Sequence, residues 1–343
     1  MKTGLIFSGQ GAQYPEMGKS LYECSPAAAK VFEEAGEDIR KLCFEADSET
    51  LKRTDVTQPT VYTVSMAAYA ALMEALGGKT DSPPAECGSA DASGSMNVEI
   101  SGVAGFSLGE YAALTAAGSI ASVSDGIAIV RERGKLMHEA GLDGAGNPKG
   151  GMIAGLAEKD AVIDCVEAAR EDGILCAVNF NSPKQTVVAG DFAALERFRG
   201  KAAEFKVRAK DLSVSTAFHS PMMVPAAEKL RSFLEGKQLN RPKVKVFADV
   251  TACDIMAEKP QNTADSDFIA DMLAKQCKSP VRWQEIVENM IADGIECFVE
   301  LGPGKTLSGF VKKINPDVKV CNVQDEESLR QTVEFLKSEE KTC

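Results

Sequence analysis

Short apolar runs alternate with helical patterns along most of the chain. The run GLIFSG is followed by a glycine-rich loop, and the run EISGVAGFS by LGEYAALTAAG, whose apolar residues recur at helical spacing. Toward the C-terminus, KVKVFADV and IECFVELG are typical of buried strands, and the second leads into the helical pattern PGKTLSGFVKKI. This alternation predicts a parallel sheet covered by helices on both faces.

A different order of elements occupies residues 141–212. GGMIAGL predicts a strand, EKDAVIDCVEAARED a helix, and ILCAVNFN with QTVVAGD a hairpin around SPK. The helical FAALERFRGKAAEF and the strand KVRAKDLSV complete the order βαββαβ, which is ferredoxin-like. We therefore predict an α/β fold. A large α/β domain with a parallel sheet comprises residues 1–140 and 213–343. A ferredoxin-like α+β small domain, residues 141–212, is inserted into it.

The composition is that of an ordinary globular enzyme. The chain has 343 residues, of which 44% are hydrophobic and 26% charged, and this length suits one large domain with an insert or two domains. Residues 78–98 are rich in Ser, Gly, Pro and Asp, which predicts a surface loop. No role can be assigned to that loop.

The net charge and the cysteines indicate which partners and which compartment to expect. The net charge of −12 disfavours nucleic acid and anionic membranes as partners, and no apolar run approaches the roughly 20 residues of a membrane span. The ten cysteines are scattered without any CxxC pair. Five of them fall in apolar or helical segments, which suits reduced thiols in the cytoplasm: Cys43, Cys165, Cys176, Cys297 and Cys321. A cysteine nucleophile remains an alternative.

The segment GVAGFSLGEYAAL places Ser107 between Gly105 and Gly109, where a predicted strand meets a predicted helix. This is the context of a nucleophile elbow, G-x-S-x-G, in which the glycines make room for a sharp turn. The Leu108 amide and the positive end of the helix can then stabilise an oxyanion. The alternative is a serine that only caps the helix. Strand, turn and helix in register favour the nucleophile.

A serine nucleophile requires a base, and the chain contains two histidines, His138 and His219. His138, in GKLMHEAG, falls near the end of a helical pattern, where a histidine commonly interacts as a cation with the helix dipole. His219, in STAFHSPMM, follows a predicted strand and precedes Pro221, which places it on a turn. A lone histidine is often structural, but beside a serine elbow we predict His219 as the base.

Three glycine strings do not complete a nucleotide-binding motif. GGKT at 77–80 and GPGKT at 302–306 lack the first glycine of G-x-x-x-x-G-K-[ST], where the chain has Met73 and Val299. GQGAQY at 9–14 has Tyr14 where a dinucleotide fingerprint has its third glycine. Nucleotide hydrolysis and nicotinamide chemistry are therefore disfavoured.

Several segments, taken together, resemble one family more specifically than any single motif does. From about residue 3 to about residue 315 the chain resembles the malonyl-CoA:acyl carrier protein transacylases and the related acyltransferase domains of polyketide synthases. The matching segments, in the family's order, are FSGQGAQYPEMG, TDVTQPTVYTVSMAAYAAL, GFSLGEYAALTAAG, RERGKLMHEAG, NFNSPKQTVVAGD, AFHSPMM, SPVRWQEIV and ELGPGKTLSGFVKKI.

The resemblance implies roles for the residues that match the reacting groups of the family. Ser107 matches the nucleophile, His219 the base, and the backbone amide of Leu108 the oxyanion donor. Gln10 matches the glutamine of the N-terminal glycine loop near the oxyanion hole. Gln276 matches the glutamine whose backbone helps to orient the histidine.

Three further matches concern the substrate. Arg133, in RERG, matches the arginine that pairs with the free carboxylate of malonyl, to which a planar guanidinium is well suited. Without the resemblance, Arg133 would be interpreted as a charge on a helix surface. Gln58, in TQPT, and Asn181, in NFNSP, match other pocket residues, and AFHS resembles the form found in malonyl-selective members.

The implied reaction moves malonyl from coenzyme A to the phosphopantetheine thiol of acyl carrier protein through a malonyl-serine intermediate, in a ping-pong scheme. The resemblance also implies that the large domain is α/β hydrolase-like. The active site is expected in the cleft between this domain and the ferredoxin-like insert, with no metal or bound cofactor. We expect a cytoplasmic monomer whose partners are malonyl-CoA and acyl carrier protein. The pathway, fatty-acid or polyketide synthesis, and the strictness of malonyl selectivity remain open.

Two departures and two rival functions accompany this interpretation. Phe106 stands where the family commonly has a histidine, which leaves His219 as the candidate base, and the loop at 78–98 is longer than the family usually carries. A serine esterase would place a carboxylate behind the histidine and release acid without an acceptor thiol. A non-catalytic module that docks the carrier protein would not need Ser107, His219 and Arg133 together.

Overall fold

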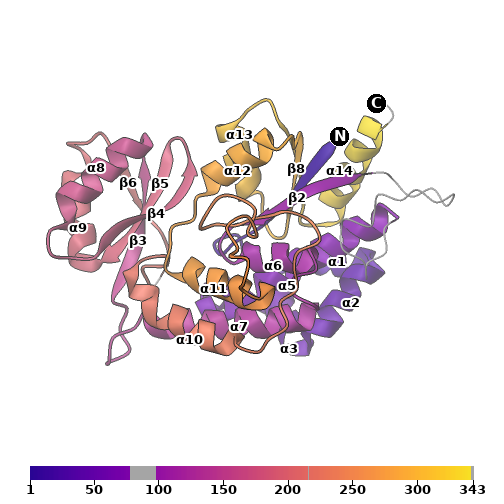
Figure 1. The fold of residues 1–343 in the computed structure, drawn as a ribbon, viewed down its shortest axis with the longest axis horizontal. Helices are drawn as coiled ribbons and strands as arrows, with labels where there is room; N and C mark the ends of the chain where they lie inside the picture. The colour runs from indigo at the N-terminus through magenta and orange to yellow at the C-terminus, as the bar shows by residue number, and fades with distance from the viewer. Residues whose placement is uncertain (78–97, 215, 341–343) are drawn as a thin grey trace.

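The computed structural model describes residues 1–77, 98–214 and 216–340. Except for Val98, the predicted loop at 78–98 lies outside these residues. The chain forms two sheets, each with its own helices, which lie side by side (Figure 1). The larger part contains both ends of the chain, and the smaller part is inserted between two of its segments (Figure 1).

The elements of the larger part come from two segments of the chain. Those before the insertion are β1 (Lys2–Phe7), α1 (Lys19–Cys24), α2 (Pro26–Ala35), α3 (Glu37–Glu45), α4 (Ser48–Leu51), α5 (Thr54–Ala75), β2 (Glu99–Gly105), α6 (Gly109–Ala116) and α7 (Val123–Ala140). Those after it are a 3-10 turn (Pro221–Met223), α10 (Val224–Leu234), β7 (Val246–Phe247), α11 (Asp265–Cys277), α12 (Trp283–Ala292), β8 (Cys297–Leu301), α13 (Thr306–Ile314), β9 (Lys319–Val323) and α14 (Glu326–Glu340).

The larger sheet has the strand order β7-β2-β1-β8-β9, and every pair in it is parallel. At the carboxyl end of β1, Phe7 pairs with Gly105 of β2 and with Leu301 of β8. The three strands therefore end level, and the loops that follow them emerge at one edge of the sheet, where parallel α/β sheets bind their ligands.

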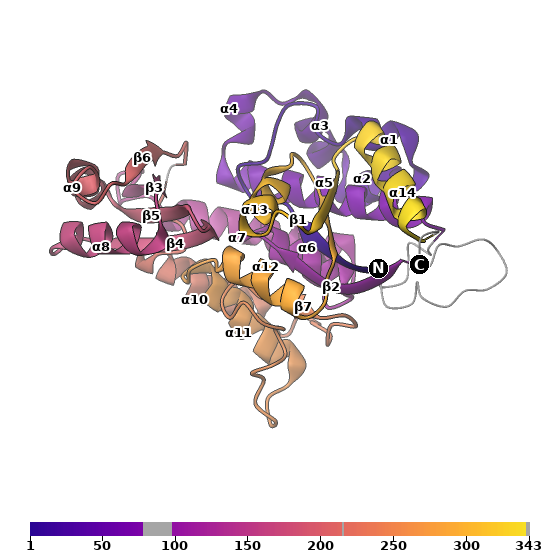
Figure 2. The same cartoon turned by 90° about the horizontal axis from the view of Figure 1, so that it is seen from above.

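Both faces of this sheet are buried. Along β1, Leu5 and Phe7 pack into the core formed with α5, α6 and α7, whereas Ile6 packs into a separate core with α12 and α13. This is the alternation expected of a strand covered by helices on both faces. Figure 1 and Figure 2, taken together, place α5 and α6 on one side of the strands and α12 on the other.

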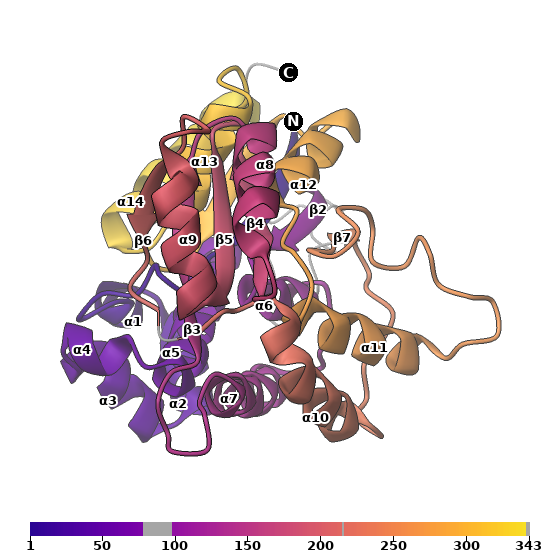
Figure 3. The same cartoon turned by 90° about the vertical axis from the view of Figure 1, so that its left-hand side faces the viewer.

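The smaller sheet, β4-β5-β3-β6, is antiparallel throughout. Its elements are β3 (Gly150–Leu156), α8 (Lys159–Arg170), β4 (Leu175–Ser182), β5 (Gln185–Asp191), α9 (Phe192–Ala202) and β6 (Arg208–Asp211). Helices α8 and α9 cover one face of the strands (Figure 3) and enclose a core that includes Val162 and Phe198. The predicted ferredoxin-like order is confirmed, as is the α/β class of the whole; the domain limits at 141 and 212 stay predictions.

Two sequence expectations need correction. The predicted strand in KVKVFADV is reduced to Val246–Phe247, because the chain turns soon after Phe247 and folds back, so that Phe247 forms an antiparallel bridge with Asp254. Of the five cysteines expected in apolar surroundings, Cys176 and Cys321 are only partly buried. All eight described cysteines are free thiols, and none of the described helices has the length and apolarity to cross a bilayer.

Candidate active site

The turn around Ser107 has no room for side chains on its two glycines. A Cβ on Gly105 would lie 1.9 Å from the backbone carbon of Gly109, and a Cβ on Gly109 would lie 2.1 Å from the carbonyl oxygen of Phe7. Ser107 itself has a φ of 53°, in the left-handed region that non-glycine residues rarely adopt. This is the strained strand-to-helix turn expected of a nucleophile elbow.

His219 contacts the elbow serine directly. Its Nε2 lies 2.8 Å from Ser107 Oγ, and its Nδ1 lies 3.0 Å from the carbonyl oxygen of Gln276 and 3.1 Å from that of Ser279. Two carbonyl acceptors at Nδ1 favour the tautomer with the proton on Nδ1. Nε2 is then the acceptor for the serine hydroxyl proton.

The environment of His219 keeps the imidazole neutral. Its side chain is buried, and burial, together with the positive charge of Arg133, lowers its pKa to about 4. The hydrogen bonds to the two backbone carbonyls oppose this shift. At neutral pH the imidazole is therefore unprotonated and able to act as a general base.

Arg133 lies in the interior, which contradicts its alternative interpretation as a surface charge. Its exposed fraction is 1%, and its guanidinium donates to Ser107 Oγ (3.1 Å), Gln58 Oε1 (2.8 Å) and Gln276 Oε1 (3.0 Å). It also stacks over the ring of Tyr111, 5.1 Å from the centroid. No carboxylate of the described residues forms an ion pair with it, so its guanidinium can pair directly with an anionic ligand.

A cleft of about 510 Å³ lies beside this cluster, between the two sheets. It is lined by Gln10 of the loop after β1, by Phe106, and by Asn181 of β4. Gln10 Nε2 donates to Thr54 Oγ1 (3.2 Å), and Phe106 packs edge-on against Trp283. The buried Asn181 Oδ1 has no hydrogen-bond partner among the described atoms.

The structure thus divides the residues proposed from the sequence into two groups. Ser107, His219, Arg133, Gln58 and Gln276 form one hydrogen-bonded cluster. The others lie around it without a hydrogen bond to Ser107: Gln10 and Asn181 line the cleft, and Leu108 is the N-cap residue of α6, at the end of the helix where N–H groups have no partner inside it. His138 is a half-buried residue in the last turn of α7.

Sequence reasoning missed two carboxyl residues beside the elbow, Glu110 and Asp249. Asp249 Oδ2 accepts from the backbone N–H of Ser107 at 2.8 Å, and its own N–H donates to Glu110 Oε2 at 2.8 Å. The sequence positions of both residues could have indicated a place near the active site. Glu110 directly follows the elbow glycine, and Asp249 follows an apolar run at the carboxyl end of a parallel strand, where functional side chains gather.

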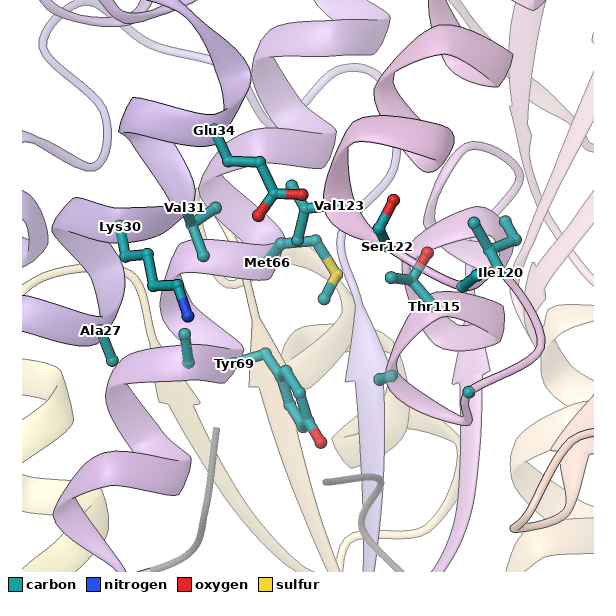
Figure 4. A pocket seen from close by; sticks show the side chains of 14 residues that line it. Ala27, Lys30, Val31, Glu34, Met66, Tyr69, Thr115, Ile120, Ser122 and Val123 are labelled. Carbon is teal, nitrogen blue, oxygen red and sulfur yellow. The ribbon is translucent and has the colours of Figure 1, made fainter. Parts of the chain in front are cut away.

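Other parts of the described chain offer less chemistry. No cluster of three or more His, Cys, Asp or Glu residues suited to a metal ion occurs among the residues that the structure describes. A hollow of about 320 Å³ lies between α2, α5 and the segment after α6 (Figure 4). Lys30, Glu34 and Ser122 line it, but neither Ser107 nor His219 does, so it is separate from the serine cluster.

Comparison with known proteins first identifies the class. The model of the acyl transferase domain family matches residues 5–329, which is nearly the whole chain. The chain is therefore an acyltransferase.

Individual relatives identify the family within that class. The malonyl CoA-acyl carrier protein transacylase of Bacillus subtilis is 37% identical over 345 residues, which cover 98% of each chain. The crystal structure of the corresponding transacylase from Clostridium perfringens has a TM-score of 0.85 at 36% identity and covers 100% of this chain and 99% of that one. A type II PKS acyl-carrier protein in complex with its malonyl-transacylase matches with a TM-score of 0.83 at 31% identity, over 98% and 100%. The chain belongs to the malonyl-CoA:acyl carrier protein transacylase family, as its sequence segments predicted.

Proposed function

We propose that this chain transfers malonyl from coenzyme A to the phosphopantetheine thiol of acyl carrier protein. The observation that carries the proposal is the cluster in which Ser107 Oγ contacts both His219 Nε2 (2.8 Å) and the buried guanidinium of Arg133 (3.1 Å). A nucleophile, a neutral base and a cation for a carboxylate are the three groups that malonyl transfer requires.

In the proposed first half-reaction, Ser107 Oγ attacks the thioester carbonyl while His219 Nε2 accepts the hydroxyl proton. The Leu108 amide, at the N-terminus of α6, donates to the oxyanion, with the glycine loop around Gln10 beside it. The tetrahedral intermediate collapses, the C–S bond breaks, and His219 returns the proton to the sulfur of coenzyme A. The carrier thiol then gives its proton to His219 and attacks malonyl-Ser107; the C–O bond to Ser107 breaks, and His219 returns the proton to Ser107 Oγ.

Arg133 is proposed to select the malonyl group. Its Nη2 donates to Ser107 Oγ and its Nη1 to Gln58 Oε1, and a malonyl carboxylate on Ser107 would lie within reach of this planar donor. Gln58 and Gln276 each accept one hydrogen bond from it and hold its plane. Asn181 and Gln10, on the cleft wall, are proposed to contact the pantetheine chain or the acyl group.

The surroundings of His219 favour the transferase over the esterase rival. Nδ1 faces two backbone carbonyls and forms no hydrogen bond with a carboxylate among the described residues. A non-catalytic docking module would have no need for a strained elbow with a neutral base against its hydroxyl.

The remaining expectations belong to the same proposal. Malonyl-CoA and acyl carrier protein are its substrates, as the names of its relatives indicate for those proteins. The scheme uses only protein groups and needs no metal or bound cofactor. We also propose a cytoplasmic monomer, consistent with the free thiols of the described cysteines. Fatty acid synthesis and polyketide synthesis remain two possible destinations for the product.

The test is malonyl transfer in a purified system. The protein is mixed with malonyl-CoA and holo carrier protein, and the carrier is weighed by mass spectrometry; apo carrier, which lacks the thiol, should stay unmodified. His219→Gln should lower transfer roughly 100-fold or more, and His138→Gln serves as the matched control that should retain it. Malonate release that equals transfer in the absence of carrier would identify an esterase instead.

A further inference from the structure

Two buried carboxyl groups lie behind the elbow, and the reaction described above uses neither. Glu110 is in the first turn of α6, and Asp249 is in the turn after β7. Both residues are 0% exposed. A buried carboxyl without a clear partner is costly, so its presence requires an explanation.

One oxygen of Asp249 connects both halves of the reacting pair. Asp249 Oδ2 accepts from the backbone N–H of Ser107 (2.8 Å) and from Gln276 Nε2 (2.9 Å). The same side-chain nitrogen of Gln276 donates to the backbone carbonyl oxygen of Ser107 at 2.7 Å. The backbone carbonyl of Gln276 accepts from Nδ1 of His219. The carboxyl of Asp249 therefore holds the backbone of Ser107 in place. It also holds the side chain of Gln276, whose backbone carbonyl orients His219.

The other oxygens of the two carboxyl groups have no donor. Asp249 Oδ1 and Glu110 Oε1 are buried and lack any hydrogen-bond partner among the described atoms. The backbone N–H of Asp249 donates to Glu110 Oε2 at 2.8 Å, which brings the two side chains next to each other. Two carboxylate oxygens cannot hydrogen-bond each other unless one of them carries a proton.

The charges around the pair agree with one shared proton. Arg133 faces it from α7 as a cation, whereas Tyr111 on α6, Cys277 on α11 and His219 are neutral at neutral pH. Burial raises the pKa of Tyr111 and of Cys277 and lowers that of His219. A pair with a single negative charge balances Arg133; a doubly ionised pair would leave an uncompensated charge in the interior.

We propose that Glu110 and Asp249 share one proton between Glu110 Oε1 and Asp249 Oδ1, and that this proton-bridged pair positions Ser107 and Gln276 for acyl transfer. The positioning role rests on Ser107 as the proposed nucleophile. Burial, followed by the neighbouring charge of Glu110, raises the pKa of Asp249 well above its usual value, and burial also raises the pKa of Glu110. No proton enters or leaves the pair during turnover.

Amide replacements test the shared proton. Asp249→Asn keeps one oxygen as the acceptor for Ser107 and Gln276 and replaces the other with an N–H group at the position of the shared proton. Glu110→Gln likewise keeps one oxygen as the acceptor for the backbone N–H of Asp249 and places its own N–H group at that position. The double variant, Glu110→Gln with Asp249→Asn, places two N–H groups against each other and leaves neither with an acceptor. We expect kcat/KM for malonyl transfer in each single amide variant to exceed that of Asp249→Ala by about tenfold or more. The double variant should fall to the level of Asp249→Ala, and a double variant as active as the single ones would overturn the positioning role.

The pH dependence of unfolding tests the proton without using activity. Between about pH 6 and pH 8 the unfolded carboxyls are ionised while the native pair keeps one proton, so unfolding releases a proton. Urea denaturation gives the unfolding equilibrium constant at each pH. The ratio of the wild-type constant to that of Asp249→Asn should rise about tenfold for each pH unit. Equal slopes would overturn the shared proton. Because this measurement is independent of turnover, a failure of Ser107 as the nucleophile would leave it intact.

Discussion

Ser107 Oγ and His219 Nε2 are 2.8 Å apart, although 112 positions separate the two residues in the chain. Both residues have a positive φ, 53° and 60°, so the backbone on each side is held in an uncommon conformation. The carbonyl groups of Gln276 and Ser279 orient the ring from behind. Every group in this contact belongs to the larger part of the molecule, and the segment just after Ser279 pairs with β4 of the smaller sheet at Val281.

The low pKa of His219 makes a prediction for acidic conditions. Activity requires the neutral imidazole, whose pKa is about 4 because of burial and the charge of Arg133. We expect kcat/KM to hold from neutral pH down to about pH 5 and to fall as the pH approaches 4. A pH profile of malonyl transfer measures this, and an acidic limb centred near the usual pKa of histidine would contradict it.

The same pKa predicts how stability depends on pH. The folded pKa of His219, about 4, lies below the ordinary histidine pKa of 6.5, so in between the unfolded state binds a proton that the folded state does not. The contribution of the neutral His219 to the free energy of unfolding is complete above pH 6.5 and is lost as the pH falls toward 4. Denaturation of the wild-type protein and of His219→Gln across this window should show a steeper loss in the wild type. His138→Gln, whose residue lies at the end of α7, is the control and should match the wild type.

Removal of the Arg133 guanidinium should change the choice of acyl group. Arg133→Ala leaves the malonyl carboxylate without its partner in a buried site, a loss on the order of 2–5 kcal/mol, so kcat/KM for malonyl-CoA should fall by tens-fold or more. Acetyl-CoA has no such carboxylate, and its transfer should fall little. Arg133→Lys should rescue malonyl transfer only in part, because the planar fork is lost. An equal loss for both thioesters would show that Arg133 supports the fold or coenzyme A binding instead.

The elbow glycine Gly109 should not tolerate a methyl group. A Cβ there would lie 2.1 Å from the Phe7 carbonyl oxygen of β1, so Gly109→Ala must displace the elbow or the strand. We expect a loss of about 1–3 kcal/mol or more in the free energy of unfolding, with reduced activity. Gly309→Ala, in α13 with nothing within 4 Å of the new Cβ, is the control and should stabilise the protein slightly. Equal effects of the two substitutions would contradict a close-packed elbow.

Local patterns were enough to predict much of the fold and the elbow. Strand, turn and helix around Ser107 are adjacent in the chain, so G-x-S-x-G and the apolar periodicity sufficed. The ferredoxin-like unit was predictable for the same reason, because its elements follow one another without interruption.

Residues whose position depends on distant packing were not predictable from local pattern. Arg133 looks like a surface charge on α7 until α5 packs against that face. The two helices approach closely at Gly134, where a Cβ would lie 2.9 Å from the Thr54 carbonyl oxygen. Only the family resemblance placed Arg133 in the pocket. Asp249 was missed because β7 holds only two residues in strand geometry, and nothing local shows that its loop reaches Ser107.

The central claim is that Ser107 carries the malonyl group, and intact-mass analysis tests it most directly. The protein is mixed with malonyl-CoA, quenched, weighed and digested to locate the adduct, and Ser107→Ala is treated in parallel. We predict a gain of one malonyl group on Ser107 in the wild-type protein, its loss when holo carrier protein is added, and no gain in Ser107→Ala. A malonyl group on a cysteine, or on Ser107→Ala to the same extent, would contradict the claim.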